Sequence, residues 1–219
     1  MNIFVTGIGT EVGKTIVSAI VVESLKADYW KPIQAGDLEN SDTHKVKNLI
    51  SNTKTKFHPN AFALNSPMSP HAAAEIDHVL IEANKIFRPK TKNHLIIEGA
   101  GGLLVPINES ETILDLIKPN DFVILVSRHY LGSINHTLSS VEILKNRGLN
   151  HMGIIFNGKE TPSSENIIEK MSRVPIIGRI EEEDYFDVIA VKKYAEKFET
   201  ALKTLIFETE QNLSSDSKK

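Results

Sequence analysis

Residues 7–15 read GIGTEVGKT and directly follow the short apolar run of residues 3–5. A strand that breaks into a glycine-rich loop ending in Gly-Lys-Thr is typical of polyphosphate binding, because the glycines let backbone N–H groups curl around anionic oxygens. Lys14 adds positive charge, the hydroxyl of Thr15 can reach a bound Mg²⁺, and a following helix points its positive end at the phosphates. The stretch therefore predicts a phosphate-binding loop between a first strand and a first helix.

The glycine spacing of this loop is unusual. The common pattern GxxxxGK[ST] requires a glycine where this chain has Ile8, whereas Gly7 lies one residue earlier and Gly9 one residue later. The alternative interpretation is a glycine-rich turn before an ordinary helix. The preceding strand, the helical pattern that follows and the Gly-Lys-Thr ending together favour the phosphate-binding loop.

Composition narrows the class of protein. A chain of 219 residues with 41% hydrophobic residues is long enough for one domain with a full core. Its net charge of −3 and the lack of a long basic block favour neither nucleic acid nor a membrane surface as a partner. The chain has no cysteine, which excludes disulfides and a cysteine nucleophile. Because we find neither a leader pattern nor an apolar run of about 20 residues, we expect a cytoplasmic protein.

Short apolar runs alternate with segments of helical periodicity. The runs are continuous, as in strands covered on both faces, and predict strands at residues 2–6, 29–33, 95–98, 122–127, 152–157 and 175–180. Helices are predicted at residues 14–26, 41–50, 76–87, 112–117, 133–147, 165–172 and 188–209. This repeat predicts an α/β fold of the P-loop NTPase type, with a parallel sheet flanked by helices on both faces. We expect residues 1–212 to form this single domain and residues 213–219 to form a disordered tail.

Polar residues follow the predicted strands at their carboxyl ends, where ligands gather in parallel sheets. Glu98 closes one apolar strand and precedes Gly99, Ala100 and Gly101. A carboxylate in this place is the usual second metal-side group of P-loop proteins, and the small residues after it let the backbone approach a γ-phosphate or a substrate. The alternative is a glycine turn with a surface glutamate.

Two further charged residues are candidates for the site. Lys31 ends the second predicted strand beside Pro32 and can aim an ammonium at a transferring phosphoryl group. A cation placed in this way stabilises a transition state by about 3–4 kcal/mol, although a solvated lysine is the alternative. Asp42 stands at a predicted helix start, where it is either a capping-turn residue or a metal-side carboxylate. The spacing leaves both possibilities open.

Taken together, these motifs resemble the dethiobiotin synthetase family. The shifted phosphate loop is that family's version, and the other elements occur in the family's order and at its spacing over residues 1 to about 160. These elements are Lys-Pro-Ile at 31–33 with Gly36, Asn-Ser-Asp at 40–42, Ser-Pro-His at 69–71, Glu-Gly-Ala-Gly-Gly at 98–102 and Leu-Gly-Ser-Ile-Asn-His at 131–136. Their combination is far more specific than any one of them.

The resemblance implies an ATP-dependent cyclo-ligase of biotin synthesis. One amine of 7,8-diaminopelargonic acid would be carbamated by CO₂, and ATP would phosphorylate the carbamate with Mg²⁺ as the cofactor. The neighbouring amine would then close the ureido ring and release phosphate. Holding both amines beside the phosphoryl group makes the ring closure intramolecular.

The resemblance also implies a role for individual residues. Lys14, Lys31 and Thr10 would be catalytic, with Lys14 on the β- and γ-phosphate oxygens, Lys31 on the carbamate and Thr10 against the diamine. Mg²⁺ would be held by Thr15, Asp42 and Glu98. The implied nucleotide contacts are Glu11, Val12, Gly13, Lys14, Thr15, Ile16, Asp42, Glu98, Gly99, Ala100, Gly101 and Asn157. The implied substrate contacts, some of them across a homodimer interface, are Ala35, Gly132, Ser133, Ile134 and Asn135.

Three positions depart from the family's pattern. Ala35 replaces a small hydroxyl residue at the substrate site, so one hydrogen bond would be missing or supplied by water. Gly158 stands where some members have aspartate, and residues 179–184 lack the Pro-x-Leu segment that covers the base. The last two departures concern the purine pocket and leave the phosphate chemistry intact.

Other classes of P-loop protein fit less well. A switch or partitioning ATPase, whose output is a binding event, usually carries an extra lysine where this chain has Thr10 and Glu11. A GTPase switch requires Asn-Lys-x-Asp, but residues 157–160 read Asn-Gly-Lys-Glu. Another amide-forming ligase of the superfamily would need a further domain for a larger substrate, and 219 residues leave little room for one.

Overall fold

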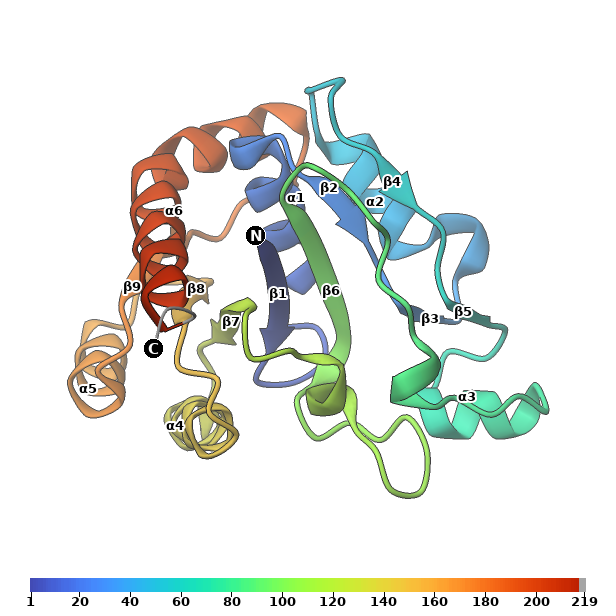
Figure 1. Ribbon diagram of the computed structural model, residues 1–219. Helices are drawn as coiled ribbons and strands as arrows, with labels where there is room; N and C mark the ends of the chain where they lie inside the picture. The colour runs from blue at the N-terminus through green and yellow to red at the C-terminus, as the bar shows by residue number, and fades with distance from the viewer. Residues whose placement is uncertain (217–219) are drawn as a thin grey trace.

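A parallel β-sheet forms the centre of the structure, a computed structural model that describes residues 1–216 (Figure 1). Among these residues its strands run, from one edge to the other, in the order β4 (Phe57–His58), β2 (Asp28–Trp30), β6 (Leu95–Gly102), β1 (Asn2–Gly7), β7 (Phe122–Arg128), β8 (Met152–Asn157) and β9 (Ile176–Ile180). Neighbouring strands pair in parallel throughout. A small second sheet pairs β3 (Ile33–Ala35) with β5 (Phe62–Leu64).

Helices cover both faces of the large sheet (Figure 1). One face packs against α1 (Lys14–Leu25), α2 (Asp42–Leu49) and α6 (Val188–Asp216). The core on the other face contains residues of α3 (Pro70–Ile76), α4 (Ser133–Asn146) and α5 (Pro162–Ser172). Short 3₁₀ turns occur at η1 (Leu38–Asn40), η2 (Ala83–Lys85) and η3 (Ile113–Leu116). The arrangement confirms the predicted α/β fold of the P-loop NTPase type in a single domain.

The strands contribute apolar side chains to both cores in alternation. In β1, Ile3 and Val5 face α1 and α6, whereas Phe4 faces the opposite core. A strand that is buried on both faces needs apolar residues at every position, which explains the continuous runs in the sequence. Because β1 lies between β6 and β7, the loop that follows it opens at the middle of the sheet's carboxyl edge.

The predicted strand at residues 29–33 is wrong in one respect, because it is two strands. β2 ends at Trp30 and β3 begins at Ile33 in the second sheet. Pro32 lacks an N–H group and cannot donate to the strand ladder, so β2 does not continue through this position. The carbonyl of Pro32 instead accepts hydrogen bonds from the N–H groups of Ala61 and Phe62, at 2.8 and 3.0 Å. This interruption leaves Lys31 between the two sheets.

The helix predicted at residues 76–87 is also wrong. α3 begins earlier, with Pro70 in its first turn where a missing N–H costs nothing, and it ends at Ile76. His78 then takes a left-handed φ of 55°, which cannot continue a helix. The segment buries Ile81 and Ile86, while Leu80 and Phe87 are exposed. Two residues five apart do not share one face of a helix, so the buried side chains here do not favour a helical turn pattern.

The remaining boundaries differ less from the prediction. Residues 112–117 contain only the 3₁₀ turn η3, closed by a reciprocal hydrogen-bonded cap between Thr112 and Asp115. The very short strands β4 and β5 were not predicted. α6 continues to Asp216, so residues 213–216 are helical rather than part of a disordered tail, and residues 217–219 lie outside the described part of the chain. No helix within residues 1–216 is long and apolar enough to cross a membrane.

Candidate active site

The loop between β1 and α1 is closed by a glycine that no other residue can replace without strain. Gly13 precedes α1 with a positive φ of 98°, and a Cβ atom there would lie 2.2 Å from Nδ2 of Asn157. That amide nitrogen donates to the carbonyl of Val12 at 2.9 Å and so ties the end of β8 to the loop. Nζ of Lys14 folds back over the loop and donates to the carbonyl of Gly9 at 2.8 Å. The loop is therefore held in one shape at the start of α1.

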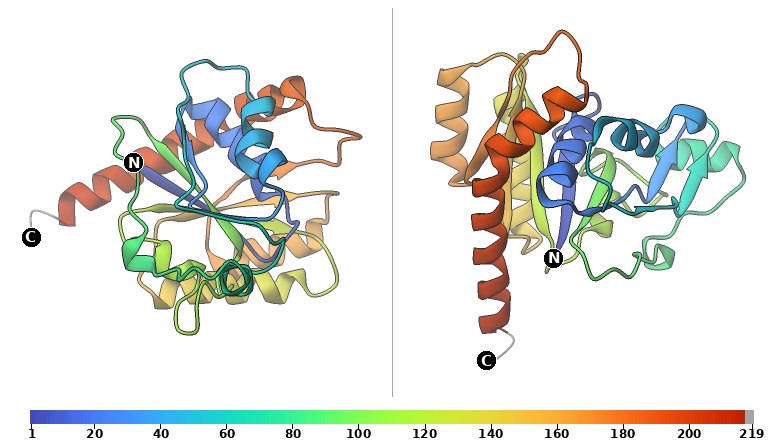
Figure 2. Two further views of the ribbon diagram at one scale, coloured as in Figure 1. Left: turned by 90° about the vertical axis from the view of Figure 1, so that its right-hand side faces the viewer. Right: turned by 90° about the horizontal axis from the view of Figure 1, so that it is seen from above.

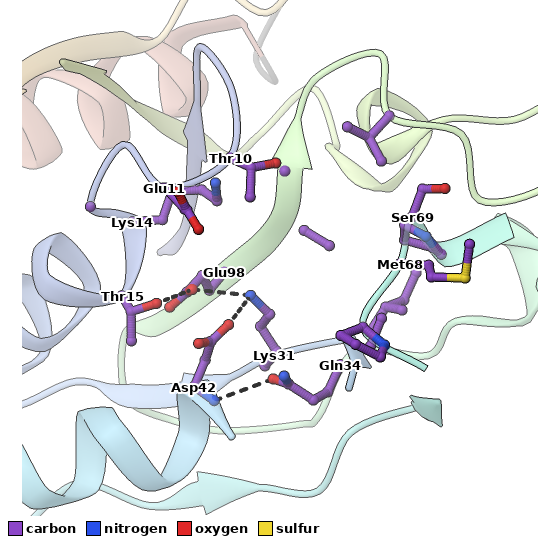
Figure 3. Close-up of a pocket in the computed structure, with 18 of the residues that line it drawn as sticks. Thr10, Glu11, Lys14, Thr15, Lys31, Gln34, Asp42, Met68, Ser69 and Glu98 are labelled. Carbon is purple, nitrogen blue, oxygen red and sulfur yellow. Dashed lines mark hydrogen bonds and ion pairs between the residues drawn. The ribbon is translucent and has the colours of Figure 1, made fainter. Parts of the chain in front are cut away.

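Lys31 is a buried cation at the break between β2 and β3, with 4% of its surface exposed. Its Nζ lies 2.6 Å from Oδ2 of Asp42 and 3.1 Å from Oε1 of Glu98 (Figure 3), and it also donates to the carbonyl of Gly99 at 3.3 Å. Burial lowers the pKa of Lys31, but the two carboxylates outweigh this effect and raise the pKa above its usual value. The ammonium therefore remains charged between two acids from different elements.

Asp42 is the first residue of α2, and its side chain turns to Lys31 rather than to its own helix end. The preceding N-cap residue, Ser41, bonds Nδ1 of His44 at 3.0 Å. The N–H of Asp42 donates to Oε1 of Gln34 at 3.3 Å, a contact that anchors the helix start to β3. Burial alone would raise the pKa of Asp42. The ammonium of Lys31, with weaker contributions from other polar neighbours, outweighs this effect, so the pKa of Asp42 lies below its usual value. The carboxylate of Asp42 thus faces Lys31 and the cavity, and its role as a metal ligand stays a prediction.

Glu98 is 1% exposed, and both of its oxygens have hydrogen-bond donors. Oε1 accepts from the hydroxyl of Thr15 at 3.0 Å and from Nζ of Lys31 at 3.1 Å. Oε2 accepts from the hydroxyl of Tyr29 at 2.9 Å. Burial and the neighbouring carboxylates raise the pKa of Tyr29 well above its usual value, so the phenol stays protonated and donates.

Lys14 lies in an environment that favours an anion beside it. Burial and the nearby ammonium of Lys31 lower the pKa of Lys14 to about 8, although Glu98 and Asp42 act in the opposite direction. A negative charge placed beside this ammonium would relieve the repulsion between the two lysines. The charges at this edge of the sheet therefore suit a phosphate group.

Segments that are far apart in the sequence line one cavity of about 650 Å³ at the carboxyl edge of the sheet (Figure 3). Its walls come from the phosphate loop, the break between the two sheets, the start of α2, residues 67–70 and the end of β6. The predicted site residues that line it are Thr10, Glu11, Gly13, Lys14, Thr15, Ile16, Lys31, Ala35, Asp42, Glu98, Ala100 and Gly101. The sequence motifs thus meet in space, as expected for one site.

Other predicted site residues lie outside this cavity. The carbonyls of Val12 and Gly99 are turned to Asn157 and Lys31 as described above, so these residues support the cavity without lining it. Four predicted substrate contacts lie at the start of α4, away from the cavity lining of the single chain: Gly132, Ser133, Ile134 and Asn135.

Several residues at or behind this site were not assigned a role from the sequence, among them Tyr29, Gln34 and Met68. Tyr29 reaches Glu98 from behind the cavity, and its separation of two residues from Lys31 was the signal that could have placed it on the same face. Gln34 and Met68 line the cavity. Nothing in the sequence singles out either residue. Gln34 lies in β3 and Met68 follows β5, so the positions of both depend on the second sheet, which was not predicted.

The oxygen atoms gathered here suit a hard divalent cation. The carboxylates of Asp42 and Glu98 flank the ammonium of Lys31, and the hydroxyl of Thr15 donates to Glu98. Mg²⁺ prefers one or two carboxylates completed by phosphate oxygens and water. Within residues 1–216 no group of three or more His, Asp or Glu side chains is placed to hold a metal ion. Two carboxylates and a hydroxyl fit a magnesium ion whose other ligands are phosphate oxygens and water.

Comparison with known proteins identifies the family. The chain matches the family described as an AAA domain over residues 1–188. An ATP-dependent dethiobiotin synthetase of Christiangramia forsetii is 65% identical over 199 residues, which cover 91% of this chain and 96% of the relative. The enzyme of the same name from Cytophaga hutchinsonii is 46% identical over 196 residues, which cover 89% of this chain and 95% of the relative.

Among solved structures, the cell division ATPase MinD of Pyrococcus furiosus has a similar fold. Its TM-score is 0.55 at 16% identity, and the match covers 91% of this chain and 99% of that chain. A likeness at this identity shows the fold alone, so it adds no support for a partitioning ATPase. The curated relatives instead confirm the resemblance carried by the motifs, and the chain belongs to the family of ATP-dependent dethiobiotin synthetases.

Proposed function

We propose that this protein forms the ureido ring of dethiobiotin from 7,8-diaminopelargonic acid, CO₂ and ATP, and releases ADP and phosphate. One observation carries the proposal: a buried ammonium, that of Lys31, lies between Asp42 and Glu98 in the cavity that the phosphate loop also lines. Phosphoryl transfer depends on positioning and charge neutralisation more than on a protein nucleophile, and this arrangement supplies both. We place the reaction in the cytoplasm, where ATP is available to biosynthetic enzymes.

The nucleotide binds along the phosphate loop. Residues 11–16 surround the phosphates with backbone N–H groups at the start of α1, and Lys14 contacts the β- and γ-phosphate oxygens. Asn157 reads the base with its amide oxygen, because its amide nitrogen is committed to the carbonyl of Val12. An oxygen acceptor in this place suits the exocyclic amine of adenine.

The oxygens of Thr15, Asp42 and Glu98 would hold Mg²⁺ together with the phosphates. When bound, the ion neutralises charge on the β- and γ-phosphates during transfer. Glu98 and Asp42 come from β6 and α2, so the two carboxylates approach the same point from different elements. The residues thus bind the cation and orient the nucleotide at the same time.

Ring formation proceeds in three bond-forming steps in the cavity. One amine adds to the carbon of CO₂ and loses a proton, which gives a carbamate. A carbamate oxygen attacks the γ-phosphorus and ADP leaves; the second amine then attacks the carbonyl carbon, loses a proton, and phosphate leaves. Lys31 stays protonated and stabilises negative charge on the carbamate and on the transferring phosphoryl group. Thr10, Glu98, Ala100 and Gly101 lie against the diamine and the γ-phosphate, and Ala35 lies beside the substrate.

The reaction is tested by measuring ADP release from the purified protein. We expect Mg²⁺-dependent release of ADP that requires both diaminopelargonate and bicarbonate, with dethiobiotin as the organic product identified by mass spectrometry. Omission of either substrate serves as the control. ADP release at the same rate without the diamine would contradict the ligase and favour an ATPase whose output is binding.

We further propose a homodimer in which the start of α4 from one protomer binds the carboxylate of the substrate held by its partner. The first N–H groups of a helix lack partners within the helix and attract anions. Leu131, directly before this turn, is fully exposed in the single chain, which supports a contact with a second copy.

Mixing two impaired variants tests this shared site. Lys31→Ala removes the cation of the cavity, and Asn135→Asp places a like charge beside the carboxylate of the diamine. Because Asn135 lies in the first turn of α4, the aspartate also favours the helix, so the fold is kept. We expect each variant alone to turn over slowly at low diamine concentration and the mixture to recover activity through mixed dimers. No recovery after subunit exchange would place the carboxylate elsewhere.

A further inference from the structure

We propose that Tyr29 is a positioning residue, whose hydroxyl holds the carboxylate of Glu98 with its other oxygen turned to Lys31 and Thr15. The catalytic consequence of this arrangement rests on the proposed function, whereas the effect on cation and nucleotide binding does not. Tyr29 lies outside the cavity lining and touches no reacting group, so it acts through Glu98.

The register of the sheet explains how this tyrosine reaches the site. β2 pairs with β6 so that Tyr29 stands opposite Ile96 and Trp30 opposite Ile97. Because side chains alternate across a strand, Tyr29 lies on the same face as Ile96 and Glu98, the face that packs against α1. Thr15, in the first turn of α1, reaches the same carboxylate from above this face.

The two oxygens of Glu98 have different tasks. Oε1 accepts from Thr15 and Lys31, which also face the cavity and are available to ligands. Oε2 accepts from the phenol of Tyr29 at 2.9 Å, and the Glu98 side chain has no exposed surface, so solvent cannot replace this donor. Without the phenol, an unpaired and buried oxygen would draw the carboxylate out of its orientation.

Tyr29 is itself held firmly. The residue is fully buried in the core beneath α1, and its ring packs against that of Phe57 with the centroids 5.8 Å apart and the planes tilted by 54°. The burial and the ring contact restrict the side chain, and its hydroxyl donates to Glu98. A neutral donor fixed in this way keeps its bond to Glu98 while Lys31 and Thr15 engage ligands.

The variant Tyr29→Phe tests the proposal because it removes one oxygen atom and keeps the ring. With ADP present and Mn²⁺ as the probe for the divalent cation, we expect about 10-fold weaker Mn²⁺ binding in an EPR titration. We expect kcat for ADP release to fall by about 10-fold as well, with KM for the diamine unchanged. Thermal unfolding of each variant verifies the fold.

Phe57→Leu is the matched control. It removes part of the packing around the ring of Tyr29 and leaves the hydrogen bond to Glu98 in place. We expect a lower Tm and an unchanged Mn²⁺ affinity. If Phe57→Leu weakened Mn²⁺ binding as much as Tyr29→Phe did, the effect would be general loosening of the core and the positioning role would be wrong.

A double-mutant cycle with Glu98→Gln tests whether Tyr29 affects Mn²⁺ binding through Glu98. If Tyr29 acts through Glu98, Tyr29→Phe causes no further loss of Mn²⁺ affinity once Glu98 is replaced. Equal losses in the two backgrounds, or a Tyr29→Phe variant that binds Mn²⁺ like the unmodified protein, would overturn the proposal. Failure of the unmodified protein to consume diaminopelargonate would refute the proposed function, while the Mn²⁺ and ADP titration would still decide the role of Tyr29.

Discussion

Replacement of Lys31 by alanine is expected to lower the rate of ADP release about 100-fold or more, while nucleotide affinity changes little. The ammonium is buried between Asp42 and Glu98 and lies at the sheet break rather than in the phosphate loop. It should therefore meet charge that develops on the carbamate and the transferring phosphoryl group, whereas the loop and Lys14 hold the ground-state phosphates. Steady-state kinetics with saturating ATP and diamine measure the first effect, and equilibrium titration with a fluorescent ATP analogue measures the second.

Lys45→Ala is the control for this variant. Lys45 is a half-exposed lysine of α2 whose Nζ pairs with Asp37 at 2.9 Å and lies 3.9 Å from Asp42. Its loss removes a positive charge close to the cavity without removing the buried cation, and we expect rates within a few-fold of the unmodified protein. If Lys31→Ala weakened nucleotide binding as much as it slowed turnover, Lys31 would be a phosphate anchor and its role in the transfer step would be wrong.

Replacement of Glu98 by alanine is expected to lower the free energy of unfolding by about 3–5 kcal/mol. The truncation would leave the hydroxyl of Tyr29 without its acceptor and the buried ammonium of Lys31 with one carboxylate instead of two. Removing one partner from a buried ionic cluster costs more than the pair contributes, because the remaining charge stays away from water. Urea unfolding followed by circular dichroism gives the free energy directly.

Asp37→Asn provides the comparison for an exposed pair, because Asp37 has a left-handed φ of 51° that asparagine also tolerates. Its carboxylate bonds Lys45 at 2.9 Å, but both side chains are well exposed to solvent. An exposed ion pair contributes at most about 1 kcal/mol, so the free energy of unfolding of this variant should be nearly that of the unmodified protein. Similar losses for Glu98→Ala and Asp37→Asn would mean that the cluster at Lys31 is open to water in solution.

Much of the site could be predicted because its functional residues belong to short sequence motifs. The glycines around Lys14 and the carboxylate at the end of an apolar strand are each recognisable without tertiary context. Their meeting follows from one rule, that the carboxyl ends of parallel strands share an edge. Glu98 and Lys31 could thus be assigned to one place from the residues alone, whereas the spacing left Asp42 two possible roles and only the resemblance to the family implied its place beside them.

The parts that could not be predicted depend on contacts that no local pattern records. In residues 76–87 the core takes up Ile81 and Ile86 and leaves Leu80 and Phe87 exposed, a choice that only the assembled fold reveals. The proline at position 32 was seen as a rigid neighbour of Lys31, but the second sheet that receives the chain after it was not predicted. Gln34 reaches the start of α2 only because that second sheet exists.

The end of helix α6 is a suitable place to attach a label to this protein. α6 has 29 residues and is about 43 Å long at 1.5 Å per residue, and its last turns extend past the sheet (Figure 2). Near that end, the carboxylate of Glu210 lies 3.8 Å from the amine of Met1, which marks the edge of the sheet opposite the cavity. A dye or surface linker attached beyond α6 would leave the cavity at the carboxyl edge of the sheet facing solution. A fusion at Met1 would instead disturb the ion pair between Met1 and Glu210.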